Sequence, residues 1–93
     1  MVTLLTRKIT LGGELPFTTQ RLQCLANAAS AFQVRVLIKR GNNTYNAKSL
    51  LGLLAMARER EREITLLVDG EEEQQAMEVL CTLLSGKALD SQA

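Results

Sequence analysis

Residues 32–40 alternate between apolar and polar side chains, and this pattern constrains the fold more than any other feature of the sequence. The apolar side chains on one face of this extended run are Phe32, Val34, Val36 and Ile38. Gly41-Asn42-Asn43 follows, and glycine and asparagine tolerate the positive φ angles of tight turns. Residues 44–47 then return as a short strand, so we expect an antiparallel hairpin within a sheet.

Two further segments are predicted to be strands. Residues 2–11 form one of them, and only Arg7 interrupts its apolar face. Residues 64–68 form the other, which Asp69-Gly70 ends. The side chains expected to point inward are Leu5, Ile9 and Leu11 in the first of these strands and Ile64, Leu66 and Val68 in the second.

A first helix is predicted to begin at Thr18, because a threonine hydroxyl can accept a hydrogen bond from a first-turn amide. Phe17 and Leu22 have the spacing of a hydrophobic staple around this cap. The helix should end near Ser30 or Ala31. Its core stripe, at the helical spacing i, i+3, i+4 and i+7, is Leu22, Leu25, Ala26 and Ala29.

Ser49 can cap a second, short helix that is apolar nearly all round. Its apolar residues are Leu50, Leu51, Leu53, Leu54, Ala55 and Met56. One sheet cannot bury all of them, so one or two should be exposed and available for docking. The alternating charges of residues 58–63 indicate a solvated turn.

Glu71, Glu72 and Glu73 are expected in the first turn of a last helix, where the helix dipole favours carboxylates. Its predicted core face is Ala76, Val79, Leu80, Leu83 and Leu84, with Met77 flanking. The order βαββαβα favours an α+β two-layer domain with its helices on one face. We expect one domain over residues 1–84 and a flexible tail over residues 85–93.

The sequence contains no histidine, which excludes a Ser-His-Asp triad, a Cys-His dyad, an imidazole metal ligand and a phosphohistidine. A net charge of +1 and only two phenylalanines and one tyrosine argue against nucleic-acid binding. The sequence has neither a long apolar run nor a signal-peptide pattern, so we expect a cytoplasmic protein without membrane insertion. We expect no cofactor, no metal and no enzymatic activity.

Two cysteines, Cys24 and Cys81, are too few and too far apart for a disulfide framework. We expect both to be buried free thiols on helix faces. The alternative is a reactive thiol, activated by a helix terminus or a neighbouring cation.

Three stretches of the chain resemble the HPr family, the histidine-containing phosphocarriers of the bacterial sugar phosphotransferase system. The most specific is Asn46-Ala47-Lys48-Ser49-Leu50-Leu51-Gly52-Leu53-Leu54-Ala55-Met56, which looks like the family's regulatory-serine region and second helix. Residues 64–76 resemble its last strand, acidic turn and last helix, and residues 15–32 its active loop and first helix. The resemblance implies an open-faced β-sandwich, in which three helices cover one face of a four-stranded antiparallel sheet.

The chain departs from this family at the active loop, which in the family reads Gly-Leu-His-(Ala/Thr)-Arg-Pro-Ala. The resemblance places Thr18 at the phosphorylated histidine, with Gln20 and Arg21 at the following arginine and proline. A threonine ester is far less labile than a phosphoramidate, so we expect no catalytic residue and no phosphocarrier reaction. We read Thr18 as a helix cap. The alternative is that Thr18 or Thr19 binds or accepts phosphate at the helix N-terminus, with help from Arg21.

Ser49 matches a serine that is phosphorylated as a regulatory signal in part of the family. The residue also reads as an N-cap, worth about 1 kcal/mol. Both roles are compatible, because a phosphate is electrostatically favourable at a helix N-terminus.

These features together predict a regulatory or protein-binding module that lacks the phosphocarrier histidine. Its partner would be a phosphotransferase-system enzyme or a transcription regulator. The predicted partner surface is Thr18, Gln20, Arg21, Leu50 and Leu51. Two alternatives remain open: a phosphotransfer component that carries phosphate on Thr18 or Ser49, and an unrelated small α+β interaction domain such as a ferredoxin-like one.

Overall fold

The computed structural model of the protein describes residues 4–12 and 17–85. Seven elements follow one another in the predicted order. They are β1 (Leu4–Thr10), α1 (Thr19–Ser30), β2 (Val34–Arg40), β3 (Asn43–Asn46), α2 (Leu50–Ala57), β4 (Glu63–Gly70) and α3 (Glu73–Leu84). The predicted tail, apart from Ser85, and the start of the strand predicted at 2–11 lie outside the described residues.

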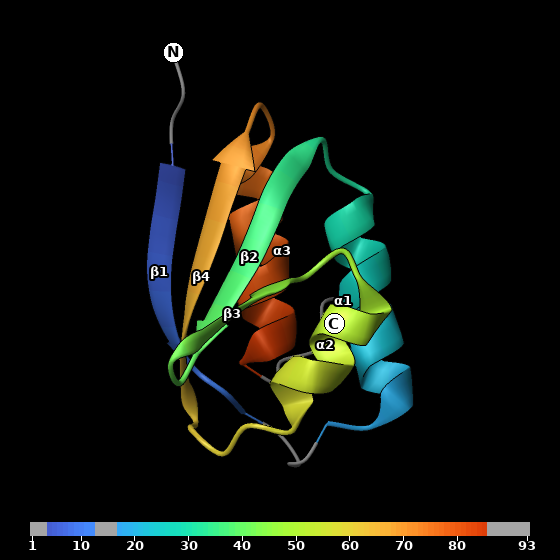
Figure 1. The fold of residues 1–93 in the computed structure, drawn as a ribbon. Coiled ribbons are helices and arrows are strands. Elements are labelled where there is room, and N and C mark those ends of the chain that lie inside the picture. The colour runs from blue at the N-terminus through green and yellow to red at the C-terminus, as the bar shows by residue number, and fades with distance from the viewer. Residues whose placement is uncertain (1–3, 13–16, 86–93) are drawn as a thin grey trace.

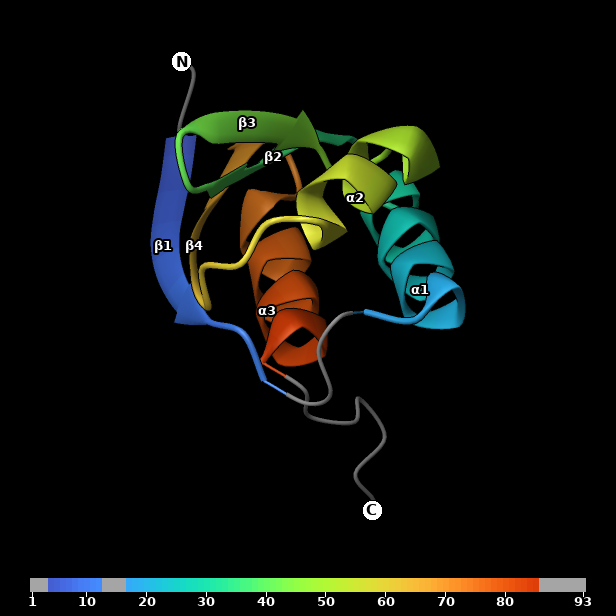
Figure 2. The same ribbon diagram turned by 60° about the horizontal axis from the view of Figure 1, so that its bottom comes forward.

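The four strands form one antiparallel sheet in the order β1-β4-β2-β3. The hairpin between β2 and β3 turns at Gly41, whose φ is +63°. Figures 1 and 2 show the three helices gathered on one side of the sheet, with α1 beside α2. The predicted α+β open-faced sandwich of four antiparallel strands and three helices is therefore confirmed.

The core lies between the sheet and the helices. On β2 and β4 the apolar side chains that face the helices are buried, whereas the residues between them are half-buried or exposed. The buried ones are Val34, Val36, Ile38, Ile64, Leu66 and Val68. Each fully buried aliphatic side chain contributes roughly 1.5–3 kcal/mol, so this layer supplies much of the free energy of folding.

Both predicted helix caps are present. The Thr18 Oγ1 accepts from the Arg21 amide at 3.1 Å, and the Ser49 Oγ accepts from the Gly52 amide at 3.2 Å. The buried residues of α1 are the four predicted ones, Leu22, Leu25, Ala26 and Ala29. The strand predicted from Phe32 begins two residues later, because the Phe32 amide donates to the Ala29 carbonyl and completes the turn after α1.

The prediction that both cysteines are buried is wrong. Cys24 is exposed, because it lies on α1 outside the buried stripe. Cys81 on α3 is half-buried, and its Sγ accepts from the Nη1 of Arg7 at 3.8 Å. Arg7 is the residue that interrupts the apolar pattern of β1, and this contact places its side chain against α3.

The last helix differs from the prediction at its start and on its buried face. Glu71 and Glu72 precede α3 instead of belonging to its first turn. The Glu72 Oε1 accepts from the Gln33 amide at 2.9 Å, so this carboxylate joins the helix start to the residue before β2. Met77 is buried, whereas Val79 and Leu83 are only half-buried. The buried face of α3 is therefore Ala76, Met77, Leu80 and Leu84.

Candidate functional site

Thr18 begins α1 as an exposed residue with extended backbone angles. Its hydroxyl oxygen is used as a cap acceptor for the Arg21 amide. Thr19 and Gln20 follow in the first turn, and both are exposed. The geometry shows a capped helix start whose outer residues can be reached by another molecule.

The guanidinium of Arg21 is held against the end of α3. Its Nη2 donates to the carbonyls of Gly12, Leu83 and Leu84, at 2.8, 3.1 and 3.3 Å. Its Cζ lies 4.0 Å from the centroid of the Phe17 ring, which is the geometry of a cation–π contact. Partial burial lowers the pKa of Arg21 from its ordinary value. The side chain therefore ties the start of α1 to the end of α3, where helix carbonyls lack intrahelical donors.

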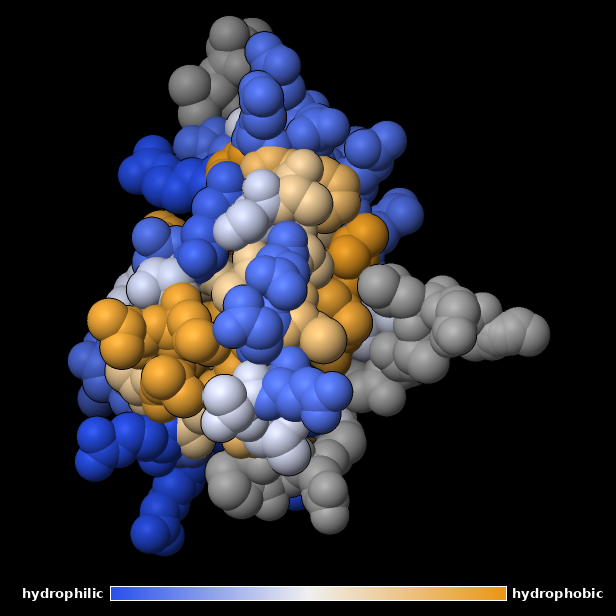
Figure 3. Space-filling view, turned by 90° about the vertical axis from the view of Figure 1, so that its right-hand side faces the viewer, coloured by the Kyte–Doolittle hydropathy of each residue, from blue (hydrophilic) through white to orange (hydrophobic). Residues whose placement is uncertain are grey.

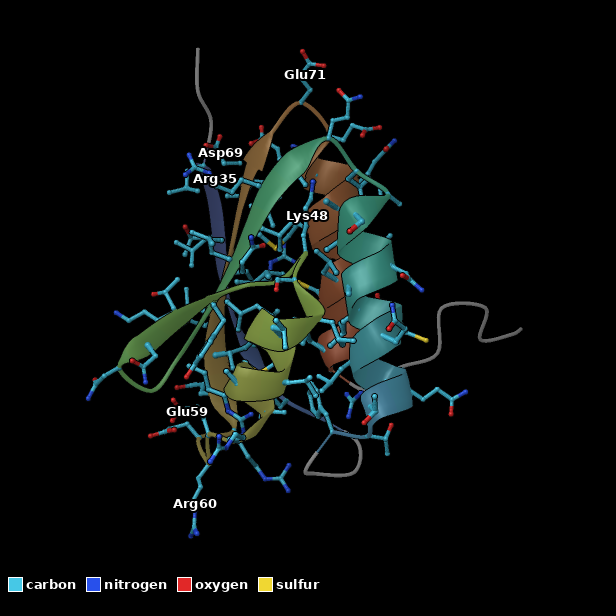
Figure 4. The ribbon with its side chains drawn as sticks, turned by 45° about the vertical axis from the view of Figure 1, so that its right-hand side comes forward. Arg35, Lys48, Glu59, Arg60, Asp69 and Glu71 are labelled. Carbon is cyan, nitrogen blue, oxygen red and sulfur yellow. The ribbon has the colours of Figure 1, made fainter. Side chains whose placement is uncertain are left out.

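Ser49 lies in a tightly held loop before α2. The Asn46 Oδ1 accepts from the Lys48 amide at 2.9 Å, and the Lys48 Nζ donates to the Phe32 carbonyl at the same distance. Figure 4 shows Lys48 between this loop and the end of α1. A Cβ on Gly52 would meet the Asn46 carbonyl oxygen at 2.8 Å, so the first turn of α2 approaches the backbone closely. Ser49 itself is half-buried and held at two points: its amide donates to the Asn46 carbonyl at 3.2 Å, and its hydroxyl accepts from the Gly52 amide.

The outer side of α2 is apolar and exposed. The exposed fraction is 79% for Leu51 and 38% for Leu54, whereas Leu53 and Met56 are fully buried. Leu50 is half-buried. Figure 3 shows the resulting hydrophobic patch over α2, with strongly hydrophilic side chains below it. An exposed apolar patch of this kind is typical of a docking surface.

The predicted site residues lie on two neighbouring helices, and one of them has its side chain directed to a third helix. Helices α1 and α2 pack against each other, so the caps Thr18 and Ser49 belong to adjacent elements. The Arg21 side chain instead contacts the end of α3. The sequence carried no signal for this role, because the three accepting carbonyls come from residues remote from Arg21 along the chain.

A second polar cluster, beside the end of α2, was missed by the sequence analysis. Arg40 is only 2% exposed, and its Nε and Nη1 donate to the Glu61 and Met56 carbonyls at 2.6 and 3.0 Å. The Glu59 carboxylate accepts two hydrogen bonds, one from the Tyr45 hydroxyl and one from the side-chain Nδ2 of Asn43 at 2.9 Å. The cluster fastens the β2–β3 hairpin to the end of α2. The charge run 58–63 is therefore mostly exposed, but Glu59 within it has a structural role.

The Glu59 contacts predict a pH-dependent stability. Hydrogen bonds from the Tyr45 hydroxyl and, to a smaller extent, the Asn43 side chain lower the pKa of Glu59 from its ordinary value of 4.5. Their contribution to the stability of the fold is therefore fully present above a pH of about 4.5 and is lost as the pH falls through the lowered pKa. The same bond raises the pKa of Tyr45, so its contribution is lost as the pH rises beyond the ordinary value of 10.0. Thermal unfolding followed by circular dichroism should show both losses.

A Glu59→Gln variant should flatten the acid limb of this profile. A Glu78→Gln variant, on the exposed side of α3, is the matched control and should keep it. Equal acid limbs in the two variants would contradict the assignment to Glu59.

The described residues contain no group of three or more histidine, cysteine, aspartate or glutamate side chains that could hold a metal ion. Among the same residues, no helix is long and apolar enough to cross a membrane.

Comparison with known proteins decides the family. A family model described as "PTS HPr component phosphorylation site" matches residues 6–86. The chain therefore belongs to the HPr family. The phosphocarrier protein NPr of Shewanella violacea is 31% identical over 92% of this chain and 94% of its own length. The HPr-like protein Crh of Bacillus subtilis is 38% identical over 56% of this chain and 61% of its own length.

Solved structures of the HPr family have the same fold. The phosphocarrier protein HPr of Bacillus anthracis superposes with a TM-score of 0.80 at 20% identity, covering 87% of this chain and 96% of that one. Crh of Bacillus subtilis superposes with a TM-score of 0.71 at 27% identity, covering 88% and 90%. Membership of the HPr family excludes one of the alternatives that the sequence left open, an unrelated small α+β interaction domain. The relatives that match include phosphocarrier proteins HPr and NPr and the HPr-like protein Crh.

Proposed function

We propose that this protein is a cytoplasmic HPr-family module that acts through protein contacts and does not carry phosphate on histidine. The observation that carries the proposal is that the sequence contains no histidine, although the chain matches the family over residues 6–86. At the position where the resemblance places the phosphohistidine, Thr18 uses its hydroxyl oxygen to cap α1. A capping threonine supplies stability to the helix but no labile phosphoramidate.

We assign the partner surface to the exposed start of α1 and the outer side of α2. Thr18 and Gln20 provide polar contacts, and Leu50 and Leu51 provide the apolar centre. Arg21 contributes to this surface indirectly: its hydrogen bonds to the end of α3 hold the start of α1 in place. The partner in this proposal is a phosphotransferase-system enzyme or a transcription regulator.

A Leu51→Glu variant tests this surface. Leu51 is 79% exposed, so the substitution should leave the fold intact. A residue that becomes buried at the centre of an interface carries a large share of the binding energy. We therefore expect the affinity of the Leu51→Glu variant for the partner to fall about tenfold or more. Calorimetric titration with purified phosphotransferase-system enzymes or catabolite regulators of the source organism measures this change.

The matched control for partner binding is Leu4→Glu. Among the residues that the structure describes, Leu4 is the next most exposed leucine, at 56%, and it lies on β1 instead of on the helices. It should bind the partner like the unsubstituted chain. Binding that survives Leu51→Glu would show that the partner uses another surface.

The second candidate function is phosphorylation of Ser49 or Thr18. The Ser49 hydroxyl lies at the N-terminus of α2, where a phosphate would be near unpaired amides and the positive end of the helix dipole. Thr18 has the same position on α1 but is more exposed.

Two incubations separate these possibilities. With phosphoenolpyruvate and the first enzyme of the relay, we expect no phosphate on the protein by intact mass. The second incubation uses ATP and a serine kinase that phosphorylates HPr-family proteins. One added phosphate that Ser49→Ala abolishes would establish Ser49 as a regulatory site. A label from phosphoenolpyruvate that survives acid but not alkali would contradict the proposal, because it would identify a hydroxyl ester formed by the relay.

A further inference from the structure

The charge run of residues 58–63 alternates in sign along the chain, but the structure separates much of its charge in space. The carboxylates of Glu59 and Glu61 turn toward the β2–β3 hairpin. A Cβ on Gly41 in that turn would lie 3.1 Å from the Glu61 Oε1 and 3.3 Å from the Glu59 Oε1. The Glu59 carboxylate is also held there by its two hydrogen-bond donors on β3.

The buried guanidinium of Arg40 gives a physical reason for this orientation. Arg40 ends β2, and its hydrogen bonds go to backbone carbonyls of α2 and of the turn after it. Burial lowers the pKa of Arg40, and the negative charges of Glu61 and Glu59 oppose this shift. A desolvated cation attracts nearby anions strongly, so the hairpin holds both carboxylates on its own side.

Two arginines of the same run are left for solvent or a partner. Arg58 and Arg60 are exposed, and the side chain of neither makes an ion pair or a hydrogen bond with a described residue. Figure 4 shows Arg60 pointing away from the domain, whereas Glu59 lies nearer the hairpin. Arg62 differs from both, because its Nη1 donates to the Leu11 carbonyl at 3.4 Å.

Arg58 continues the apolar outer side of α2. The exposed residues of this helix, Leu51, Leu54 and Ala55, have the spacing of one helical stripe. Arg58 is the C-cap residue and follows Leu54 and Ala55 on the same stripe. Figure 3 shows strongly hydrophilic side chains directly below the apolar patch. The apolar surface therefore passes into a cationic one at the end of α2.

No carboxylate on the two neighbouring helices balances these cations. Neither α1 nor α2 contains an aspartate or a glutamate, although the whole chain has a net charge of only +1. Acidic residues instead precede and begin α3, at Glu71, Glu72 and Glu73. The layer of α1 and α2 is therefore positive on a protein that is nearly neutral, and such a surface is complementary to a negative one.

We propose that Arg58 and Arg60 extend the partner surface beyond the end of α2 and select a protein that presents carboxylates beside an apolar contact. This inference rests on the proposed function, because it names the chemistry of the partner that the outer side of α2 binds. A protein fits better than an anionic membrane, since even a whole acyl chain gives only marginal membrane binding and α2 exposes two leucines.

The two parts of this surface have different kinetic roles. Exposed charges at the rim of an interface act chiefly on the association rate and on its dependence on salt. A central apolar contact acts chiefly on the dissociation rate. Arg58 and Arg60 therefore steer the partner, and Leu51 retains it.

Binding kinetics test the steering role, with the purified phosphotransferase-system enzymes and catabolite regulators that serve for Leu51→Glu. The double variant Arg58→Gln/Arg60→Gln should lower the association rate constant about tenfold at low ionic strength and leave the dissociation rate nearly unchanged. Rising salt should slow association of the unsubstituted chain more than that of the double variant.

Two control variants separate position from net charge. Lys8→Gln/Lys39→Gln removes the same charge from two exposed residues that both pair with Thr65 on the sheet, and it should associate like the unsubstituted chain. Glu61→Gln should change the affinity less than about twofold, because its carboxylate faces the hairpin. Unchanged association of the arginine variant, or an equal loss in the lysine variant, would overturn the proposal and leave the proposed function standing.

A pair of peptides tests the chemistry of the surface without a known partner. Both are amphipathic helices with a leucine face, and one carries glutamates where the other carries lysines. In NMR titrations of the full chain, the glutamate peptide should shift the amide signals of residues 51, 54, 58 and 60, and the lysine peptide should not. Equal shifts with both peptides, or none with the glutamate peptide, would overturn the proposal.

Two further outcomes distinguish this inference from the proposed function. If no phosphotransferase-system protein or regulator binds, the proposed function is contradicted, and the peptides still decide which chemistry the surface recognises. Vesicles of phosphatidylglycerol and phosphatidylcholine are the lipid probe. A chain that sediments with these vesicles and does not respond to the glutamate peptide would identify a membrane surface and overturn the proposal.

Discussion

Replacing Gly70 with alanine should lower the free energy of unfolding by about 4 kcal/mol, from backbone strain and overpacking together. Gly70 ends β4 with a φ of +148°, which side-chain-bearing residues rarely adopt. A Cβ there would lie 2.6 Å from the Gln33 carbonyl oxygen and 2.7 Å from the Val34 Cα. Both are backbone atoms, one in the first residue of the paired strand β2 and one in the residue before it, so neither can move aside without disturbing the sheet.

The expected loss is a large part of the total, since a domain of this length has a stability of roughly 5–14 kcal/mol. Urea unfolding followed by circular dichroism near neutral pH measures it. The matched control is Gly41→Ala in the β2–β3 turn, where φ is +63° and the added Cβ meets only the ends of glutamate side chains. Gly41→Ala should cost about 1 kcal/mol. Equal losses at the two glycines would show that the close approach to β2 is unimportant.

Replacing Arg21 with methionine should lower the free energy of unfolding by about 2 kcal/mol, because the Gly12 and Leu83 carbonyls lose hydrogen bonds from a charged donor. The Leu84 carbonyl keeps one donor, the Gly12 amide at 3.1 Å. Methionine keeps much of the apolar stem but removes the donors to Gly12, Leu83 and Leu84. The contact with Phe17 loses its cationic part. The half-buried position limits the effect, since water can reach some of the carbonyls.

The control for this change is Gln20→Met, an exposed neighbour in the same turn, which should alter stability by less than about 0.5 kcal/mol. Hydrogen exchange gives a second measurement. Protection should fall at the start of α1 and the end of α3 together in the Arg21 variant, because one side chain joins them. A loss confined to α1 would argue that Arg21 acts only on its own helix.

Much of the fold followed from local patterns. The alternation in residues 32–40 predicted the buried face of β2, and the helical spacing from Leu22 to Ala29 predicted the buried face of α1. Thr18 and Ser49 were identified as caps because capping depends on residues within one turn. Each of these predictions rests on contacts between near neighbours in the chain.

Only part of the candidate site could be predicted from such local patterns. The exposed apolar side of α2 follows from a helix with more leucines than one sheet can cover. The role of Arg21 does not follow, because its acceptors are on the loop after β1 and at the end of α3. The role of Glu59 was missed for the same reason, since its donors Tyr45 and Asn43 belong to the hairpin.

The sequence by itself determined the order of the elements, the two helix caps and the absence of a phosphocarrier histidine. The last of these needs no coordinates, because no arrangement of the chain can supply a missing imidazole. Only the tertiary structure decided that β4 lies between β1 and β2, that Arg21 closes the end of α3, and that the carboxylates of Glu59 and Glu61 turn toward the β2–β3 hairpin. The physical reason is that pairing and packing between distant segments depend on how the whole sheet closes, which periodicity within one segment does not specify.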